Sequence, residues 1–204
     1  MNVSPRPFSA PVSRAASFAG AVGVLLIGGM ALMQALPPPA RSADTPAGAD
    51  GQPCTLHPDG FLRVRFFGAL DFTADWSGAD LLCDGMWRPD GAGVRLFFAK
   101  TRPGGDRLSV LIGIDGRPEN SVGIERPANV TIRDDSQGRF FSSGGPGRCW
   151  ASINSATVLP GARGRRANLR IAGLVYCVGA LPAIGERSSL TLGDLYFAGR
   201  VGGD

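Results

Sequence analysis

The run VRLFFAKTRPGGDRLSVLIGI, residues 94–114, decides the fold class of this chain. It holds two apolar segments, residues 94–99 and 108–114, separated by Pro103-Gly104-Gly105-Asp106. β-Branched and aromatic residues suit the pleated, half-buried surface of a strand. Glycine and proline supply the backbone angles of a tight connection. The run therefore predicts two short strands joined by a turn.

The same pattern recurs along the rest of the chain. Short apolar runs alternate with Gly/Pro/Asp clusters, and residues 130–133 alternate apolar with polar side chains, which is typical of a sheet with one buried face. Strands are expected near residues 61–67, 70–74, 79–86, 94–99, 108–114, 121–124, 129–133, 139–142, 149–153, 168–177 and 189–201. This spacing predicts an all-β fold, an antiparallel β-sandwich or barrel-like domain of about ten short strands.

The N-terminal part differs from this pattern. Residues 15–36 carry no charge, follow Arg6 and Arg14, and precede three prolines at 37–39. As a helix they would be about 33 Å long, close to the thickness of a bilayer core. We therefore expect residues 1–36 to form one hydrophobic helix, either a cleaved signal peptide or a transmembrane anchor. Residues 37–53 are interpreted as a Pro/Ala-rich linker, and residues 54–204 as a disulfide-linked β-domain.

The charge distribution argues against nucleic-acid binding. The whole chain has 21 basic and 17 acidic residues; without the three arginines and two aspartates of residues 1–50, 18 basic and 15 acidic residues remain. These are well mixed, whereas a nucleic-acid interface needs a clustered basic face. Lys100 is the only lysine, a bias that we interpret as bacterial GC-rich coding.

Four cysteines fit an exported protein. Cys54, Cys83, Cys149 and Cys177 are isolated from one another, unlike the closely spaced pairs of zinc sites, so two disulfides are expected. The separations 54–149 and 83–177 are 95 and 94 residues, which raises the hypothesis of a duplicated half-domain. Duplication would favour the pairs Cys54–Cys83 and Cys149–Cys177 among the three connectivities.

Nucleophilic catalysis has little support in the sequence. His57 is the only histidine, it precedes a proline, and no Gly-x-Ser-x-Gly motif accompanies it. The acidic segment 71–84 is the alternative. Asp71 and Asp75, with Asp80 and Asp84 nearby, could hydrolyse a glycoside or hold calcium, or simply cap loops. We assign no catalytic residue, no metal ligand and no cofactor, and lean against an enzyme.

Two groups of residues are candidates for ligand binding. Arg163, Arg165 and Arg166 form the main basic cluster and could meet anionic lipid or polysaccharide, or lie in a solvated loop. Trp76 and Trp87 lie close to the acidic segment, where they could stack on sugar rings or pack in the core. Trp150, directly after Cys149, is expected to pack over the disulfide.

These observations predict an exported β-domain with a non-catalytic binding or structural role in the cell envelope. It would be anchored on the periplasmic side of the inner membrane, or secreted after cleavage. Its expected contacts are the membrane through residues 15–36, and envelope polysaccharide, anionic lipid or a protein. A carbohydrate-active enzyme using segment 71–84 and a protein-interaction subunit with an exposed sheet edge are the alternatives.

Overall fold

The computed structural model describes residues 52–54, 60–145, 147–161 and 166–202, all within the compact unit Thr45–Asp204. The strands are β1 (Gln52–Pro53), β2 (Phe61–Gly68), β3 (Phe72–Ser77), β4 (Leu81–Trp87), β5 (Gly93–Thr101), β6 (Arg107–Asp115), β7 (Glu125–Asp134), β8 (Arg139–Ser142), β9 (Cys149–Leu159), β10 (Asn168–Cys177), β11 (Leu181–Pro182), β12 (Ser189–Leu192) and β13 (Leu195–Val201). Two single-turn 3-10 helices, η2 (Gly78–Asp80) and η3 (Pro118–Asn120), lie between them. The predicted all-β, antiparallel class is confirmed.

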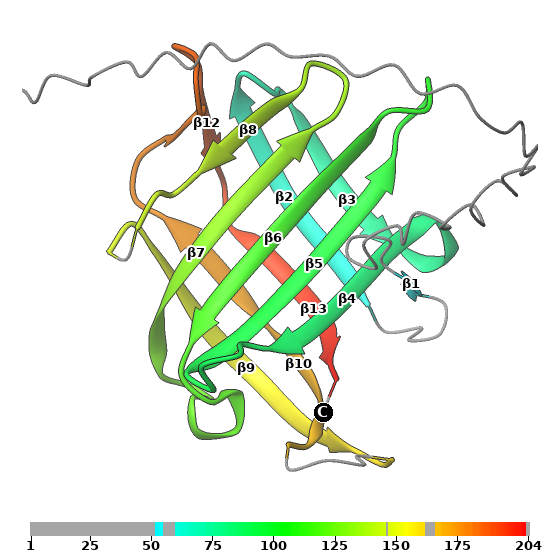
Figure 1. Ribbon diagram of the computed structural model, residues 1–204, viewed down its shortest axis with the longest axis vertical. Coiled ribbons are helices and arrows are strands. Elements are labelled where there is room, and N and C mark those ends of the chain that lie inside the picture. Colours follow the sequence, from blue (N-terminus) through cyan, green and yellow to red (C-terminus); the bar gives the residue numbers. More distant parts are fainter. Residues whose placement is uncertain (1–51, 55–59, 146, 162–165, 203–204) are drawn as a thin grey trace, which may run out of the picture. The chain divides into compact units, whose positions relative to one another are not determined.

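All thirteen strands belong to one sheet, which folds over itself into two layers (Figure 1). Its order is β1-β4-β5-β6-β7-β9-β10-β13-β2-β12-β11, with β3 beside β2 and β8 beside β7. Strands β4 to β8 form the layer nearer the viewer in Figure 1, and β2, β3, β10, β12 and β13 lie behind it. The turn between layers occurs at β7, whose first residues pair with β9 while its last residues pair with β8. The described unit is therefore sandwich-like.

The sheet also closes on itself where β4 approaches the end of β13. Met86 forms a parallel bridge with Gly202, and the Gly202 amide donates to the Gly85 carbonyl at 2.9 Å. A Cβ atom on Gly85 would lie 2.1 Å from the Arg200 carbonyl oxygen. Only a glycine lets these backbones approach so closely, so Gly85 makes the contact between the layers' edges feasible.

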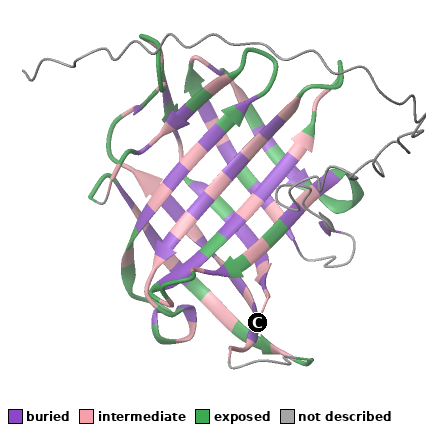
Figure 2. Cartoon of the chain, viewed as in Figure 1, coloured by how far each residue is buried: buried purple, intermediate pink, exposed green. Residues whose placement is uncertain are grey.

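Buried residues alternate with more exposed ones along the strands of both layers (Figure 2). In β6 the inward residues Leu108, Val110, Ile112 and Ile114 are all fully buried. The largest side chains that are completely buried are Phe66, Phe98, Phe141 and Phe197. This packing accounts for the sequence pattern, because in a strand every second residue faces the core.

Both disulfides have the predicted pairing, Cys54–Cys83 and Cys149–Cys177. The first joins the end of β1 to β4, and the second links directly opposed residues of β9 and β10. The duplication hypothesis is not matched by the topology. Strands β2 and β3 lie between the first pair of cysteines, whereas β9 and β10 follow each other along the chain.

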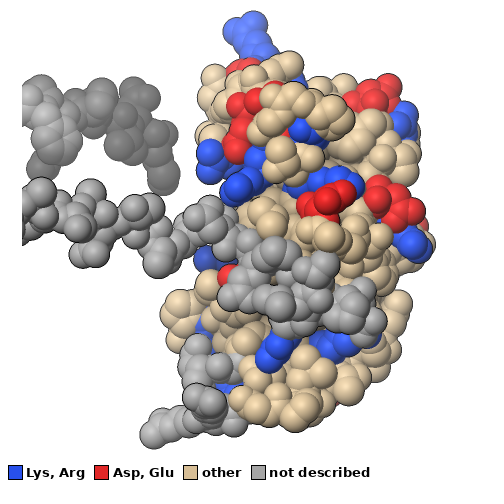
Figure 3. Space-filling view, turned by 90° about the vertical axis from the view of Figure 1, so that its right-hand side faces the viewer, with Lys and Arg blue, Asp and Glu red and all other residues tan. Residues whose placement is uncertain are grey.

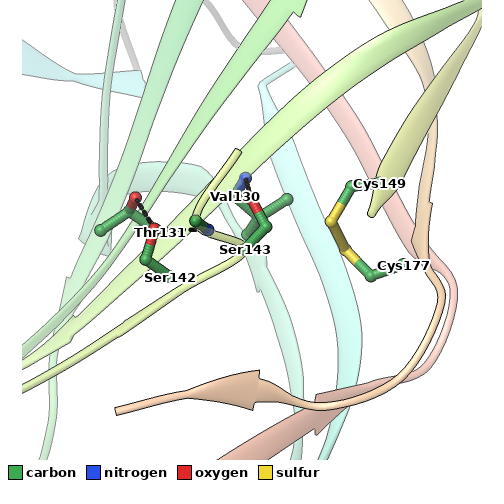
Figure 4. The surroundings of a disulfide bond; sticks show 7 residues. Val130, Thr131, Ser142, Ser143, Cys149 and Cys177 are labelled. Carbon is green, nitrogen blue, oxygen red and sulfur yellow. Dashed lines mark hydrogen bonds between the residues drawn. A yellow bond between two sulfur atoms is a disulfide. The ribbon is translucent and has the colours of Figure 1, made fainter. Parts of the chain in front are cut away.

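The chain leaving β8 is fixed to β7 close to the second disulfide (Figure 4). The buried Ser143 hydroxyl accepts a hydrogen bond from the Val130 amide at 3.1 Å, and the hydroxyls of Thr131 and Ser142 lie 3.4 Å apart. The Ser143 amide also donates to the Val130 carbonyl at 2.9 Å. These bonds satisfy polar groups that burial would otherwise penalise.

Three of the expected strands differ clearly from the structure. Ala79 and Asp80, expected at the start of a strand, belong to η2. Residues 121–124 form a turn, because Gly123 has φ +74° and the Ile124 amide donates to the Ser121 carbonyl at 3.0 Å. Residues 189–201 are two strands, β12 and β13, interrupted at Gly193 and Asp194.

The predicted N-terminal helix and residues 37–51 of the predicted linker lie outside the described residues. Gln52 and Pro53, the last two residues assigned to the linker, instead form β1 beside β4. Within the part of the chain that the structure describes, no helix has both the length and the apolar character needed to span a bilayer.

Candidate functional site

The acidic candidates lie on the outer face of the β2–β3 hairpin. Asp75 accepts a hydrogen bond from Arg63 at 2.8 Å, and Asp71 accepts one from Arg65. Both carboxylates are more than 60% exposed. Trp76 points the other way and is 6% exposed, so it packs in the core. The structure therefore separates the tryptophan from the acids that the sequence placed beside it.

The two other acids of segment 71–84 do not converge with them. Asp80 lies exposed in η2, and the exposed Asp84 accepts a hydrogen bond from the Gly85 amide at 2.7 Å. Among the described residues, no three histidine, cysteine, aspartate or glutamate side chains come together as metal ligands would. His57, Arg163 and Arg165 lie outside the described residues.

Two predicted candidates from distant parts of the sequence, Trp87 and Arg166, do meet. The Arg166 guanidinium lies 5.8 Å from the centre of the Trp87 ring, and that of Arg117 lies 5.7 Å from it. The indole N–H donates to the Ala167 carbonyl at 3.1 Å. Because Trp87 is only 4% exposed, its ring serves as a cation–π partner for arginine and is closed to a sugar.

The charged groups around Trp87 are already engaged with one another. Arg88 binds Asp90 at 2.8 Å and Asp115 at 2.5 Å, and Arg117 binds Glu119 at 2.7 Å. Asp90 also accepts the Ala92 amide at 2.9 Å. This amide bond, followed by the charge and hydrogen bond of Arg88, lowers the pKa of Asp90 despite the opposing effect of burial. The cluster is built as a network that holds loops together.

The surface shows the same mixing of charge. Figure 3 views the described unit from the β3–β4 side, where acidic and basic side chains lie next to each other. Such paired charges on a solvated surface each contribute at most about 1 kcal/mol to stability. These side chains offer hydrogen-bond donors and acceptors of both charges, and neither positive nor negative charge dominates the area.

A different set of residues forms the more distinctive feature, beginning with Trp150. The expectation that Trp150 packs over its disulfide is wrong. Cys149 faces the core and is fully buried, while Trp150 faces outward and is partly exposed. Its ring stacks instead on Tyr176 of β10, with centres 5.8 Å apart and planes inclined by 21°.

The apolar surface continues from this stack across β10 to β13. Leu174 lies two residues before Tyr176, on the same side of β10. It is the register partner of Tyr196 on β13, and Tyr196 is 45% exposed. Tyr196 is in turn opposite Arg63 of β2. We call the set Trp150, Leu174, Tyr176 and Tyr196 the aromatic face.

One edge of the aromatic face is held by a hydrogen bond. The Tyr176 hydroxyl donates to the Glu125 carboxylate of β7 at 2.9 Å. This bond, together with partial desolvation and the negative charge of Glu125, raises the pKa of Tyr176 above its usual value of 10.0. The phenol therefore remains a neutral donor, and its ring keeps one orientation beside Trp150.

The alternation of side chains in the sequence already contained a signal for this face. Because Cys149, Ala151 and Ile153 are apolar at every second position, Trp150 and Ser152 between them must face outward. Pairing β10 with β9 on one side and β13 on the other depends on long-range register, which a single sequence does not specify. Comparison with protein-family models, with curated proteins and with solved structures finds no match to this chain.

Proposed function

We propose that this protein is an exported, non-catalytic binding module of the bacterial envelope, and that the aromatic face is its binding surface. Two disulfides support an oxidising location such as the periplasm or the cell exterior. Residues 15–36 would either anchor the domain to the inner membrane or be removed on export. The observation that carries the proposal is that tyrosine and tryptophan side chains from three neighbouring strands share one solvated sheet face.

Such a face is unusual as a purely structural feature. Isolated exposed apolar side chains are normal, but a contiguous aromatic group rimmed by polar residues is typical of an interaction site. The tryptophan and tyrosines present both an apolar ring and a polar atom, so they can remain in contact with water until a ligand covers them.

The enzymatic alternative has weaker support. Glycoside hydrolysis needs two carboxylates that face one another across the scissile bond. Asp71 and Asp75 instead each bind an arginine of β2 on an open surface. No observation on the described residues favours this alternative over binding.

The proposal can be tested with the purified full-length chain. Co-sedimentation with insoluble envelope polysaccharide is measured for the wild type, Tyr196→Ala and Phe140→Ala. Flotation is measured as the excess with anionic-lipid over neutral-lipid vesicles, because the uncharged residues 15–36 would attach the full-length chain to both kinds. Phe140 is 40% exposed but belongs to β8, so it is a matched control. We expect at least one partner to bind the wild type and the control but not Tyr196→Ala. Equal behaviour of all three chains, or hydrolysis that depends on Asp71, would contradict the proposal.

A further inference from the structure

The aromatic face extends across strands. Trp150 lies on β9, Tyr176 and Leu174 on β10, and Tyr196 on β13, and these strands are consecutive neighbours in the sheet. Adjacent strands are about 4.8 Å apart and residues along a strand about 3.4 Å apart. Tyr196 lies level with Leu174, two residues from the level of Trp150 and Tyr176, so Trp150 and Tyr196 are separated diagonally by roughly 12 Å. A ligand that contacts both must be elongated and run across the strands.

The charges that flank the aromatic face balance one another. At the β2 side, Arg63 is bound to Asp75 at 2.8 Å. At the β7 side, Glu125 accepts the Tyr176 hydroxyl. Binding to an anionic membrane is driven by several basic residues together, which this arrangement of opposite charges does not provide. The flanks instead offer both donors and acceptors to a ligand with little net charge.

The aromatic face is also small. The line across the strands that holds Leu174 and Tyr196 ends in polar residues, with Ser152 of β9 opposite Leu174 and Arg63 of β2 opposite Tyr196. A stable protein interface buries about 800 Å² on each partner around an apolar centre. A group of four side chains with polar ends is too small for such an interface and is better suited to a thin chain that carries its own hydroxyl groups.

A chain of pyranose sugars has the required chemistry. The C–H faces of the ring are apolar and slightly positive, and they pack against the negative face of an aromatic ring. The hydroxyl groups project from the ring edge, where carboxylates, guanidinium groups and serine hydroxyls can bind them. Successive sugars would meet alternating ring contacts along the row from Trp150 to Tyr196.

We infer that the aromatic face binds a polysaccharide chain of pyranose sugars, which stacks on Tyr196 and on the Trp150–Tyr176 pair. This inference rests on the proposed binding function. Glu125 acts as a positioning residue, because its bond to Tyr176 fixes the ring, and its other carboxylate oxygen can accept a sugar hydroxyl. Arg63 and Asp75 supply a donor and an acceptor at the opposite end.

Isothermal titration of the full-length chain with cello-oligosaccharides and chito-oligosaccharides of increasing length tests the inference. Affinity should rise with length until the ligand spans the row, and then level off. Tyr196→Ala should weaken binding by roughly tenfold, the size expected for one aromatic contact. Tyr196→Phe should bind like the wild type because it keeps the ring, and Phe140→Ala should also be unchanged.

The outcomes separate the inference from the proposed function. If neither series of oligosaccharides binds, or if Tyr196→Ala and Phe140→Ala bind equally well, the polysaccharide inference is overturned. If Tyr196→Ala in that case abolishes the preference for anionic over neutral vesicles, the face is a binding site for lipid and the proposed function stands. If Tyr196→Ala changes no binding at all, both fail. Unchanged far-UV circular dichroism and melting temperature of the variants exclude misfolding as the cause.

Discussion

Asp134 is the residue whose replacement should most clearly distinguish structural from solvated charges. It ends β7 and its side chain is only 1% exposed. The carboxylate pairs with Arg102, which follows β5, and with Arg139 of β8 at 3.1 Å. The Ser136 hydroxyl donates to it at 2.7 Å. Arg139 also donates to the Ala69 carbonyl at 3.2 Å, so three connections between strands depend on this one acid.

Asp134→Asn removes the negative charge with almost no change in shape. The guanidinium groups of Arg102 and Arg139 then lose the carboxylate between them, and the Arg139 side chain is only 14% exposed. Breaking a buried ion pair by removing one partner costs about 3–5 kcal/mol. At roughly 2–4 °C per kcal/mol for a domain of this size, the melting temperature should fall by roughly 6–20 °C.

The adjacent residue provides a matched control. Asp135 also binds an arginine, Arg133, at 2.5 Å, but the two side chains are 32% and 55% exposed. Solvated pairs of this kind contribute about 0–1 kcal/mol, so Asp135→Asn should change the melting temperature little. The measurement is urea unfolding and thermal melting of both variants at neutral pH. Losses that agree within about 0.5 kcal/mol would refute the interpretation of Asp134 as a buried anchor.

The pH dependence follows from the same contacts. Burial acts to raise the pKa of Asp134, but the hydrogen bonds from Ser136, Arg139 and Arg102 outweigh it and hold the pKa below its usual value of 3.8. A carboxyl with a lowered pKa in the folded state stabilises the fold above its usual value and loses this effect as pH falls through the folded pKa. The wild type should therefore lose stability below about pH 4, and Asp134→Asn should lose less over that interval.

Three further predictions concern the disulfides, the closure of the sheet and the aromatic face. Non-reducing peptide mapping should recover both predicted disulfides, and removing either by a double Cys→Ala substitution should cost about 3–4 kcal/mol in urea unfolding; a destabilisation near zero would contradict this. Gly85→Ala should lower the free energy of unfolding by at least about 2 kcal/mol, because its Cβ would meet the Arg200 carbonyl. Gly113→Ala is the control: its Cβ would meet nothing closer than 3.9 Å, so it should change stability by less than about 1 kcal/mol. Equal effects of the two substitutions would argue against a tight closure. Glu125→Gln should lower the pKa of Tyr176 towards 10.0 in an ultraviolet titration of the folded protein, and an unchanged titration would show that the hydrogen bond does not form in solution.

The parts of the fold that follow from local pattern could be predicted from the sequence. The hairpin of β5 and β6 follows from two apolar runs around a glycine-rich turn, and the bounds of β10 match the expected residues 168–177. The split between β12 and β13 could not be derived in this way. It depends on the Gly193 amide reaching the Arg65 carbonyl at 2.8 Å, a contact between segments far apart in sequence.

The candidate site was harder to predict because function here depends on which face a residue occupies. Asp134 stands at the start of the turn-like stretch Asp134-Asp135-Ser136-Gln137-Gly138, yet it continues the inward series of Val130 and Ile132 and is therefore buried. Trp150 was expected to pack over a disulfide, although it alternates with Cys149. In both cases the alternation of side chains along a strand predicts the correct face of the sheet, whereas the type of the neighbouring residue suggests the wrong environment. The pairing of Trp150 with Tyr176 needed the register of β9 and β10, which only the structure supplies.

The packed interior of the described unit favours its outer surface as the place where a ligand would bind. Phe66, Phe98, Phe141 and Phe197 fill the space between the layers, and close packing of this kind leaves little room for a ligand. The β9–β10 disulfide lies one residue from Trp150 and one from Tyr176, so the crosslink that holds these strands together also fixes the backbone beneath the stacked rings. A preorganised surface loses less conformational entropy when it binds. Loss of this disulfide should therefore weaken ligand binding by the aromatic face even under conditions in which the domain stays folded.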